Sequence, residues 1–463
     1  MKKAGLTPVP RAGAHETGEI SDLRSFIHLL REAGEIAEIR REVSAVHELG
    51  AVLKACELIG KAAYFDRVEG YGAPVIGGVL GSHGRISLAL GAETQSDVFE
   101  RVRAAPMNPI APEMVQEPAP CQEVVIDASD VDLHALPVPT HAPDDVAPFI
   151  NAGIVIAREP TTGRHNLSFN RLQIFDRNVT GINMNAWRDM DEFLRQAEDQ
   201  GRNLPFCVAI GVDPVLQMSA AFRYPGDEYE IAGALRKAPV PVTPAGTCDV
   251  LVPAYAEYIL EGEVLAGERR SEGPMAEFTG HYSGTTDQPV ARIARITHRT
   301  DPIFQTIAGA SAEHLLLGNA LTREPALDTA VRNMSPRVRA VRLPGTGFAA
   351  VITMEDPRPG EPRSVALAAL SFHVNTKMVI VVDADVNIDD PWDLLWAIST
   401  RVRWERDCVI IPGALGNPLD PSSDRNSVQS KVIIDAVLPS DTDRTYHKVR
   451  YPDIDLREYL SEQ

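Results

Sequence analysis

The sequence predicts a mixed α/β (α+β) protein built from several parts, and three observations support this fold class. An amphipathic helix pattern occupies residues 21–34, and short strand patterns separated by turn residues fill residues 151–184. Near residues 377–402 a continuous apolar strand precedes a capped helix, which is typical of a buried parallel sheet. With 463 residues, 44% of them apolar, the chain is long enough for two or three domains with their own cores.

The first helix is predicted in "SDLRSFIHLLREAGE", with Ser21 as the N-cap and Gly34 just past the end. Its helical spacing places four apolar side chains on one face: Leu23, Phe26, Ile27 and Leu30. The glycines of the later stretch "APVIGGVLGSHGRISLALG" do not have the G-x-G-x-x-G spacing of a dinucleotide site. We therefore expect turns in that stretch.

Two proline-rich stretches, "APMNPIAPEMVQEPAP" and "LPVPTHAPDDVAP", indicate a domain boundary. The strand patterns "AGIVIARE", "NLSFNRLQIF" and "VTGINM" follow, and they predict a β-meander or a barrel that extends to about residue 305. A helix interrupts them in "NAWRDMDEFLRQAEDQG" and ends at Gly201. The apolar stripe of this helix is expected to belong to the core, and it consists of Trp187, Met190, Leu194 and Ala197.

The carboxyl-terminal third begins with a helical linker pattern, "AEHLLLGNALTREPALDTAVRNM". The segment "KMVIVVDADVNIDDPWDLLWAISTRV" then predicts a buried parallel strand and a helix with Asp390 as N-cap and Pro391 at its first position. Its "DADVN" resembles the start of a calcium loop, but Ile388 and Leu394 occupy the positions that need Gly and Glu, so a structural role is expected. The predicted parts are an N-terminal α+β domain (1–115), a central β domain (116–308), a helical linker (309–330) and a C-terminal α/β domain (331–463).

Composition and charge argue against several classes of partner. The chain has 45 basic and 64 acidic residues and a formal charge of −19, without a basic stripe, so a nucleic-acid partner is not expected. The five cysteines are odd in number, far apart and outside any C-x-x-C pattern, which predicts neither a disulfide framework nor a thiolate zinc site. No apolar run has membrane-spanning length and the first residues contain no signal-peptide core, so we expect a cytoplasmic protein without a membrane partner.

Two carboxylates stand close together in "SEGPMAEFTGHY", where Glu272 and Glu277 flank Gly273 and Pro274. Because a Gly-Pro pair prevents helical pairing, a turn or bulge must place these two acids. Carboxylates that share a cation can have their pKa values pushed apart, and the raised one becomes a proton donor at neutral pH. An exposed acidic turn is the alternative interpretation.

A possible cation for these acids lies in "RHNLSFNRLQIFD". Asn166, Ser168 and Asn170 share one strand face there, whereas Arg171 and Gln173 fall on the other face. A polar set that switches faces requires a bulge or two wet surfaces, and a guanidinium is the natural bidentate partner of carboxylates. A barrel strand with one exposed rim is the alternative.

Five separated motifs together resemble the UbiD family of reversible decarboxylases, which use prenylated FMN. They are, in chain order, "NLSFNR", "PGDEYEIAGAL", "VPAYAEYILEGEV", "SEGPMAEFTGHY" and "TKMVIVVDADVNIDDPWDLLWAISTR". The similarity covers nearly the whole chain. It implies that the central domain is a split β-barrel like that of flavin reductases, which holds the cofactor.

The resemblance also implies a catalytic network of Arg171, Glu272 and Glu277. In that network Glu277 is the proton donor, Arg171 orients the substrate carboxylate and Glu272 tunes the other two groups. The implied reaction is reversible non-oxidative decarboxylation of an aromatic, heteroaromatic or α,β-unsaturated acid through a covalent adduct of the cofactor. His281, Tyr282 and His314 are candidate pocket residues, although barrel packing or linker structure explains each equally well.

The family binds Mn²⁺ (or Mg²⁺) beside the cofactor phosphate, with K⁺ nearby. Asn166 and Glu228 match two of the three metal ligands, and hard oxygen donors suit such an ion. No histidine matches the third ligand, and His165 lies on the opposite strand face. Either Asn183 or Asn185 replaces it with an amide oxygen, or the metal site is weaker than in the family. Lys377 matches a lysine that reaches the cofactor phosphate. The implied cofactor-binding residues are Asn166, Ser168, Phe169, Asn170, Arg171, Glu228 and Lys377.

Partners and alternatives follow from the same resemblance. The expected partners are a small carboxylic acid, CO₂ and a flavin prenyltransferase that supplies the cofactor, and the chain is expected to form a homo-oligomer (dimer or hexamer). An FMN-dependent oxidoreductase on the same barrel is the alternative function. A non-enzymatic flavin-binding or assembly protein is the third interpretation.

Overall fold

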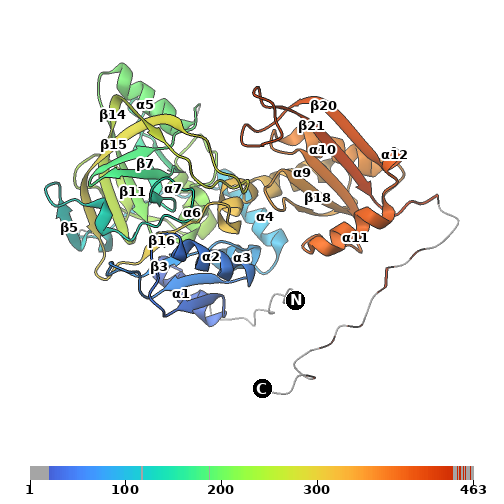
Figure 1. The fold of residues 1–463 in the computed structure, drawn as a ribbon, viewed down its shortest axis with the longest axis horizontal. Helices are drawn as coiled ribbons and strands as arrows, with labels where there is room; N and C mark the ends of the chain where they lie inside the picture. The colour runs from blue at the N-terminus through green and yellow to red at the C-terminus, as the bar shows by residue number, and fades with distance from the viewer. Residues whose placement is uncertain are drawn as a thin grey trace. The chain divides into compact units, whose positions relative to one another are not determined.

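The computed structural model describes residues 20–115, 118–186 and 188–441, together with positions 446, 448, 449, 452, 454 and 459. The chain divides into two compact units, Met1–Ala326 and Leu327–Gln463, which are described separately below (Figure 1). The amino-terminal segment on which the expectation about export rests, and Trp187 of the predicted helical stripe, lie outside the described residues.

Helix α1 (Leu23–Glu32) opens the described chain and begins one residue later than predicted. Its N-cap is Asp22 and not Ser21, because the Asp22 carboxylate accepts the backbone N–H of Ser25 at 2.8 Å. The Ser25 hydroxyl in turn accepts the backbone N–H of Asp22 at 3.1 Å, which completes a capping box. The predicted stop is confirmed, since Gly34 has a φ of 66°. The predicted apolar face is also buried: Leu23, Phe26, Ile27 and Leu30.

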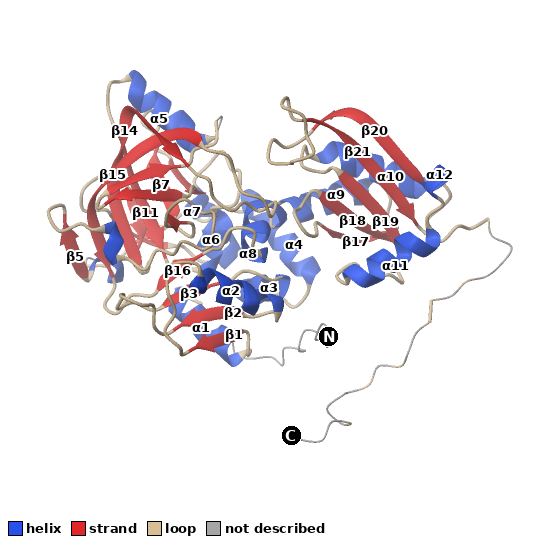
Figure 2. Ribbon diagram, viewed as in Figure 1, coloured by secondary structure: helices blue, strands red, loops and turns tan. Residues whose placement is uncertain are grey.

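The N-terminal sheet has the strand order β1–β2–β3–β16. Three of its strands lie near the start of the chain, whereas β16 comes from residues that follow the central sheet. Ser82 caps α3, which forms part of the glycine-rich stretch where turns were predicted, and Figure 2 shows α2 and α3 next to the sheet. The elements are β1 (Ile36–Ile39), α2 (Glu48–Leu58), β2 (Ala62–Phe65), β3 (Val75–Gly77), α3 (His83–Leu90), α4 (Gln95–Ala104) and β16 (Phe304–Thr306).

The central sheet has the order β6–β9–β10–β15–β14–β11–β7–β8, and β5 also pairs with β15. Only Asn170 and Arg171 join β8 to β9, although these strands lie near opposite ends of the order. The sheet must therefore curl until its ends approach, and it forms a half-barrel. The strands are β5 (Val124–Asp127), β6 (Phe149–Ile150), β7 (Ile154–Arg158), β8 (His165–Phe169), β9 (Leu172–Asp176), β10 (Val179–Ile182), β11 (Leu204–Ile210), β14 (Tyr258–Glu272) and β15 (Thr286–His298).

The segment "NLSFNRLQIF" was predicted as one strand, and this is wrong. The chain leaves β8 after Phe169 and enters β9 at Leu172, so the polar set changes face at a break between two strands and not at a bulge. The break is invisible to a local pattern because each half pairs with a different neighbour: β8 with β7, and β9 with β6 and β10.

Apolar side chains fill both faces of the half-barrel. The inner face packs around Val155, Ala157, Leu172, Phe206 and Leu260, among others. The outer face is covered by α6, α7 and the β12–β13 hairpin, which contribute to a second cluster with Ile156, Leu167 and Cys207. The remaining elements are β4 (Glu113–Met114), α5 (Asp189–Asp199), α6 (Pro214–Ser219), α7 (Glu228–Arg236), β12 (Pro241–Pro244) and β13 (Leu251–Pro253).

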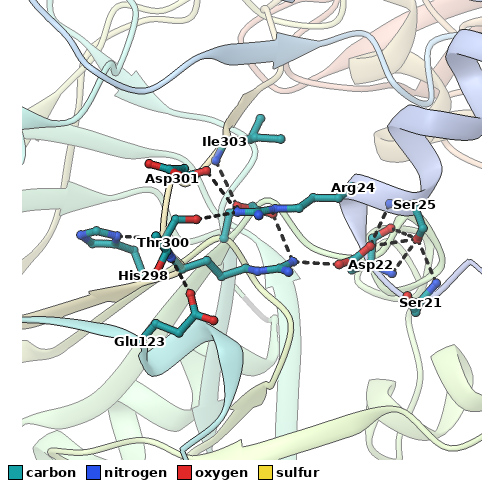
Figure 3. Close-up of polar contacts among 11 residues, drawn as sticks. Ser21, Asp22, Arg24, Ser25, Glu123, His298, Thr300, Asp301 and Ile303 are labelled. Atoms are coloured by element: carbon teal, nitrogen blue, oxygen red, sulfur yellow. Dashed lines mark hydrogen bonds and ion pairs between the residues drawn. The ribbon is translucent and has the colours of Figure 1, made fainter.

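A buried carboxylate fastens α1 to the half-barrel (Figure 3). Glu257 is fully buried, and its two oxygens accept Arg24 Nε at 2.7 Å and Arg24 Nη2 at 2.8 Å. Arg299 adds a 2.8 Å bond to the N-cap carboxylate of Asp22. Glu257 precedes β14 directly, so this cluster anchors one end of the strand that carries Glu272 at its other end.

The second unit is an α/β sheet with the order β17–β18–β19–β21–β20. The predicted buried strand is β19, which pairs in parallel with both β18 and β21, and Asp390 caps α11 with Pro391 at its start, as predicted. The elements, which include α9 at the boundary between the units, are α9 (Arg323–Met334), β17 (Val338–Arg342), β18 (Ala349–Met354), α10 (Glu361–Phe372), β19 (Met378–Asp383), α11 (Pro391–Arg401), α12 (Trp404–Asp407), β20 (Cys408–Leu415) and β21 (Val428–Ala436).

The aspartates of "DADVN" have the predicted structural role. Arg401 donates to Asp383 at 2.7 Å and to both oxygens of Asp385 at 2.9 and 2.7 Å, so a protein cation already neutralises them. Among the helices of the described residues, none is long and apolar enough to cross a membrane.

Candidate active site

Glu272 is the last residue of β14 and its side chain is fully buried. It stands opposite Thr286 of β15, with Gly181 of β10 beside it. A Cβ atom at position 181 would lie 2.8 Å from the Phe175 ring and 3.5 Å from Glu272 Cγ. Glycine at this position therefore leaves room for the Phe175 ring, and Glu272 Cγ lies at ordinary contact distance.

Glu277 lies in the turn that joins β14 to β15, so a turn places the two acids, as predicted. The turn starts at Gly273, whose φ of 88° favours glycine, and it closes through the backbone N–H of Glu277, which donates to the His281 carbonyl at 2.8 Å. Gly309 packs directly on it, because a Cβ there would lie 2.2 Å from the Ala276 carbonyl oxygen.

Three side chains from outside or across the turn hold its backbone. Gln173 accepts the N–H of Gly273 at 2.9 Å, Ser283 accepts that of Met275 at 3.1 Å, and Asp145 accepts that of Ala276 at 2.8 Å. These acceptors fix successive parts of the segment that leads to Glu277. Gln173 belongs to the polar set noted in the sequence, whereas the sequence did not point to Ser283 and Asp145, which are ordinary polar residues without a motif.

Arg171 brings the two acids together. Its Nε and Nη2 donate to the two oxygens of Glu272 at 2.6 and 2.9 Å, and its Nη1 pairs with Glu277. Its Nη2 also donates to Ser283 Oγ at 3.3 Å, and the guanidinium carbon lies 5.8 Å from the centre of the Phe149 ring. The bidentate contact with Glu272 fixes the plane of the guanidinium, and Glu277 accepts a single contact from it.

The surroundings of Glu277 and Arg171 shift the pKa of each group for different reasons. Burial raises the pKa of the Glu277 carboxyl, and the negative charge of Glu272 adds to this rise, whereas Arg171 opposes it. Burial alone would lower the pKa of Arg171, but the hydrogen bonds and charges of the two glutamates outweigh it and raise that pKa. The arginine therefore stays cationic, and Glu277 is the group suited to hold and release a proton.

A chain of hydrogen bonds leads from Asn166 to this cluster. Asn166 Nδ2 donates to Ser168 Oγ at 3.0 Å, and Ser168 Oγ donates to Asn170 Oδ1 at 2.8 Å. Asn170 Nδ2 then donates to the Asn183 carbonyl at 2.7 Å, and Asn183 Nδ2 donates to Glu272 Oε2 at 3.2 Å. The structure thus connects the residues predicted around the metal to the predicted catalytic acids. Phe169 is instead packed partly buried against the outer-face cluster.

Glu228 is the first residue of α7 and its carboxylate is buried. Its Oε2 accepts the N–H of Leu167, the neighbour of Asn166, at 2.9 Å, and burial raises its pKa to about 8. No ion pair of Glu228 exists among the described residues. A buried carboxylate that has no ion pair among the described residues fits a divalent cation.

The structure does not single out a residue for the third predicted metal ligand. The described residues contain no cluster of three or more His, Cys, Asp or Glu side chains that could hold a metal. Asn183 is held by Glu272, whereas Asn185 is exposed. His165 pairs with Asp227 at 3.2 Å and its Nε2 accepts the N–H of Leu251, so its imidazole is engaged elsewhere.

The three candidate pocket histidine and tyrosine residues differ in environment. The His314 ring lies edge-on to Phe278, with 6.1 Å between ring centres, and burial together with the charge of Arg171 lowers its pKa to about 4. His281 and Tyr282 are exposed, with the His281 ring bonded to the Thr279 carbonyl at 3.2 Å. His314 is thus a neutral imidazole close enough to Arg171 to be affected by its charge.

Lys377 lies in the second unit, directly before β19. Its Nζ pairs with Asp420 Oδ2 at 2.7 Å and bonds Ser422. These partners hold the partly exposed ammonium group within its own unit.

Comparisons with known proteins identify the family along most of the chain. Residues 27–105, 113–311 and 317–436 match, respectively, the N-terminal, Rift-related and C-terminal domains described for 3-octaprenyl-4-hydroxybenzoate carboxy-lyase, UbiD. An anhydromevalonate phosphate decarboxylase from Methanothermobacter thermautotrophicus is 32% identical over 385 residues, which cover 81% of this chain and 88% of that protein.

Solved structures agree with this assignment. The UbiD-class enzyme HmfF from Pelotomaculum thermopropionicum, solved in complex with FMN, is 36% identical with a TM-score of 0.88, over 95% of this chain and 100% of that one. The 3,4-dihydroxybenzoic acid decarboxylase AroY from Klebsiella pneumoniae is 30% identical with a TM-score of 0.88, over 95% and 99% of the two chains. From its three matched domains and its fold, this chain belongs to the UbiD family of carboxy-lyases.

Proposed function

We infer that this protein catalyses reversible, non-oxidative decarboxylation of an aromatic, heteroaromatic or α,β-unsaturated carboxylic acid with prenylated FMN as cofactor. One observation carries the proposal: the bidentate Arg171–Glu272 pair and the contact of Arg171 with Glu277 unite two carboxylates around one guanidinium. A related HmfF structure holds prenylated FMN, and AroY acts on a dihydroxybenzoic acid, which supports this cofactor and substrate class.

The roles of the protein groups follow from their environments. Glu277, with its raised pKa, delivers the proton that replaces CO₂, and in the reverse direction it removes that proton. Arg171 orients the substrate carboxylate, because its charge is maintained and its plane is fixed by Glu272. Glu272 holds the arginine, and Asn183 holds Glu272 through its 3.2 Å hydrogen bond. The bound prenylated flavin supplies the electrophilic centre that withdraws electrons from the carbon bearing the carboxylate.

Cofactor binding is assigned to the groups around the hydrogen-bonded chain. Asn166 and Glu228 hold Mn²⁺ (or Mg²⁺) beside the cofactor phosphate, and Ser168, Phe169 and Asn170 line the same strand end. Asn183 or Asn185 supplies the missing amide oxygen, and K⁺ binds nearby. His281, Tyr282 and His314 contact the substrate, His314 as a neutral ring.

Redox chemistry on plain FMN gains no support from the named relatives, whose names describe decarboxylases. Such chemistry would not need two acids on one arginine. We further propose that the active protein is a homo-oligomer that takes its cofactor from a flavin prenyltransferase; one relative was solved as an evolved dimeric form.

The test uses full-length protein produced together with a flavin prenyltransferase and Mn²⁺. A panel of hydroxybenzoic, methoxybenzoic, heteroaromatic and unsaturated aliphatic acids is incubated with it, and loss of acid and release of CO₂ are measured. Glu277→Gln is compared with Glu268→Gln, an exposed glutamate of β14 in the same hairpin. We expect Glu277→Gln to lower turnover by about 10²–10⁴-fold and Glu268→Gln to leave it unchanged. Protein that holds unmodified FMN, oxidises NADH and tolerates Glu277→Gln would contradict the proposal.

A further inference from the structure

Two cysteines that are far apart in the sequence meet on the outer face of the half-barrel. Cys207 of β11 and Cys248 of the turn between β12 and β13 have their sulfur atoms 3.7 Å apart. The sequence had predicted no cysteine pair, because forty residues and several elements separate these positions. Both are free thiols in the structure.

A buried carboxylate holds the turn over β11. Glu261 of β14 stands opposite Cys207 in the strand register, and its Oε2 accepts the backbone N–H of Thr247 at 2.6 Å and the Thr247 hydroxyl at 2.7 Å. Thr247 directly precedes Cys248. The contact between the two sulfurs is therefore fixed by the sheet register and by Glu261, not by the thiols alone.

The two thiols differ in access and in acidity. Cys207 is fully buried in the outer-face cluster, whereas Cys248 is partly exposed. A hydrogen bond from Cys207 lowers the pKa of Cys248, and the same contact together with burial raises the pKa of Cys207. A partly exposed, more acidic thiol next to a buried one has the arrangement of a peroxide-sensitive cysteine with a resolving partner.

We propose that Cys207 and Cys248 form a reversible intramolecular disulfide when the protein meets hydrogen peroxide. The Cys248 thiolate attacks one peroxide oxygen, which gives a sulfenic acid and releases the second oxygen as hydroxide. The hydroxide takes up the proton that the Cys248 thiol lost on ionisation and leaves as water. The Cys207 sulfur then displaces the sulfenic hydroxyl, which leaves as a second water when it takes the Cys207 proton. Two thiols and one peroxide thus give one disulfide and two waters, and the S–S distance shortens from 3.7 Å to about 2.05 Å.

The disulfide would fix the turn beside a segment that contacts the candidate site. Leu251, three residues after Cys248, donates its N–H to His165 Nε2 at 3.2 Å and accepts the Tyr229 hydroxyl at 2.9 Å. His165 precedes Asn166, and Tyr229 follows Glu228. The disulfide therefore joins β11 to the β12–β13 hairpin. This hairpin contacts His165 and Tyr229, the chain neighbours of Asn166 and Glu228.

The remaining cysteines provide internal controls. Burial raises the pKa of Cys121 to about 12 and also raises that of Cys56, so neither competes for peroxide. Cys408 is partly exposed in the second unit, where no cysteine contact exists among the described residues. Oxidation of Cys408 therefore shows what peroxide does to an accessible thiol that has no second cysteine beside it.

The test treats reduced full-length protein with hydrogen peroxide, blocks free thiols by alkylation and maps the peptides by mass spectrometry. We expect a Cys207–Cys248 cross-linked peptide, the loss of two of the five alkylatable thiols and full recovery with dithiothreitol. Cys408→Ser should retain the cross-link, and Cys248→Ser should abolish it while Cys207 stays alkylatable after denaturation.

Two results would overturn the proposal. One is oxidation of Cys248 to sulfinic or sulfonic acid while Cys207 remains a thiol. The other is retention of both thiols at a peroxide concentration that oxidises Cys408. Because mapping of the unmodified sequence decides between these outcomes, the test does not depend on the folding of any variant.

Discussion

Arg171 donates to both carboxylate oxygens of Glu272, at 2.6 and 2.9 Å, although the two lie 101 positions apart in the chain. The first residue lies at the break between β8 and β9 and the second ends β14. The curl of the half-barrel is what joins them, since it returns the chain from one end of the sheet to the other at Arg171. The pair is thus a direct product of the fold.

Removal of Arg171 should destabilise the protein strongly. Arg171→Ala leaves the fully buried Glu272 carboxylate without its cation, and such losses cost about 3–5 kcal/mol. Chemical denaturation followed by fluorescence measures this change. The control is Arg269→Ala on the same hairpin, whose more exposed pair with Glu198 should contribute at most about 1 kcal/mol. Equal effects of the two variants would show that the buried pair has no special role.

The rate of decarboxylation should fall as pH rises through the pKa of Glu277, because the reaction needs its protonated form. That pKa is raised in the folded protein, so the fall occurs above the range of an ordinary glutamate. The same shift means that ionisation of Glu277 removes stability as pH rises from its unfolded pKa through its folded one. A pH profile of kcat, with denaturation midpoints over the same range, measures both. A rate that rises through this window would contradict the acid role.

Asp145 should act as a positioning residue for Glu277. Asp145→Ala removes the acceptor of the Ala276 N–H, and we expect kcat to fall about 10–10²-fold, with a stability loss of about 1–3 kcal/mol. Asp144→Ala is the matched control, because Asp144 is exposed and contributes only its backbone N–H to Tyr282. To separate positioning from simple destabilisation, the pH profile of kcat is recorded: misplacement of Glu277 shifts it, whereas lower stability alone does not.

Loss of the buried carboxylate of α7 should weaken metal binding. Glu228→Gln is expected to lower the affinity for Mn²⁺ by at least about tenfold, as measured by calorimetric titration of metal-free protein. Glu230→Gln on the same helix lies outside this contact and should bind Mn²⁺ normally. If both variants bind as the unmodified protein does, the metal assignment at Asn166 and Glu228 is wrong.

Local patterns predicted much of the fold. The apolar face of α1, the stop at Gly34, and the Asp390 cap before α11 all depend on neighbouring residues, which a sequence displays directly. The N-cap at Asp22 was missed by one position because Ser21 and Asp22 are both good caps, and only the bond to Ser25 distinguishes them. The break between β8 and β9 was missed because strand pairing partners lie elsewhere in the chain.

The candidate site likewise contains residues that the sequence indicated and residues that it did not. Glu272 and Glu277 were identified from their spacing around a Gly-Pro pair, and family resemblance joined them to Arg171. Asp145 was not identified, since it reaches the turn from 131 residues away and carries no motif. The same holds for Cys207 and Cys248, whose contact depends on strand register.

The position of β16 also has a consequence for how the chain is synthesised. Residues 36–77 leave the ribosome early, but the strand that pairs with β3 follows only with Phe304–Thr306. Until then the edge of β3 that pairs with β16 has unpaired backbone groups. Arg24 likewise has no Glu257 to bind until residue 257 has been translated. The amino-terminal region therefore reaches its native form after the half-barrel has been translated.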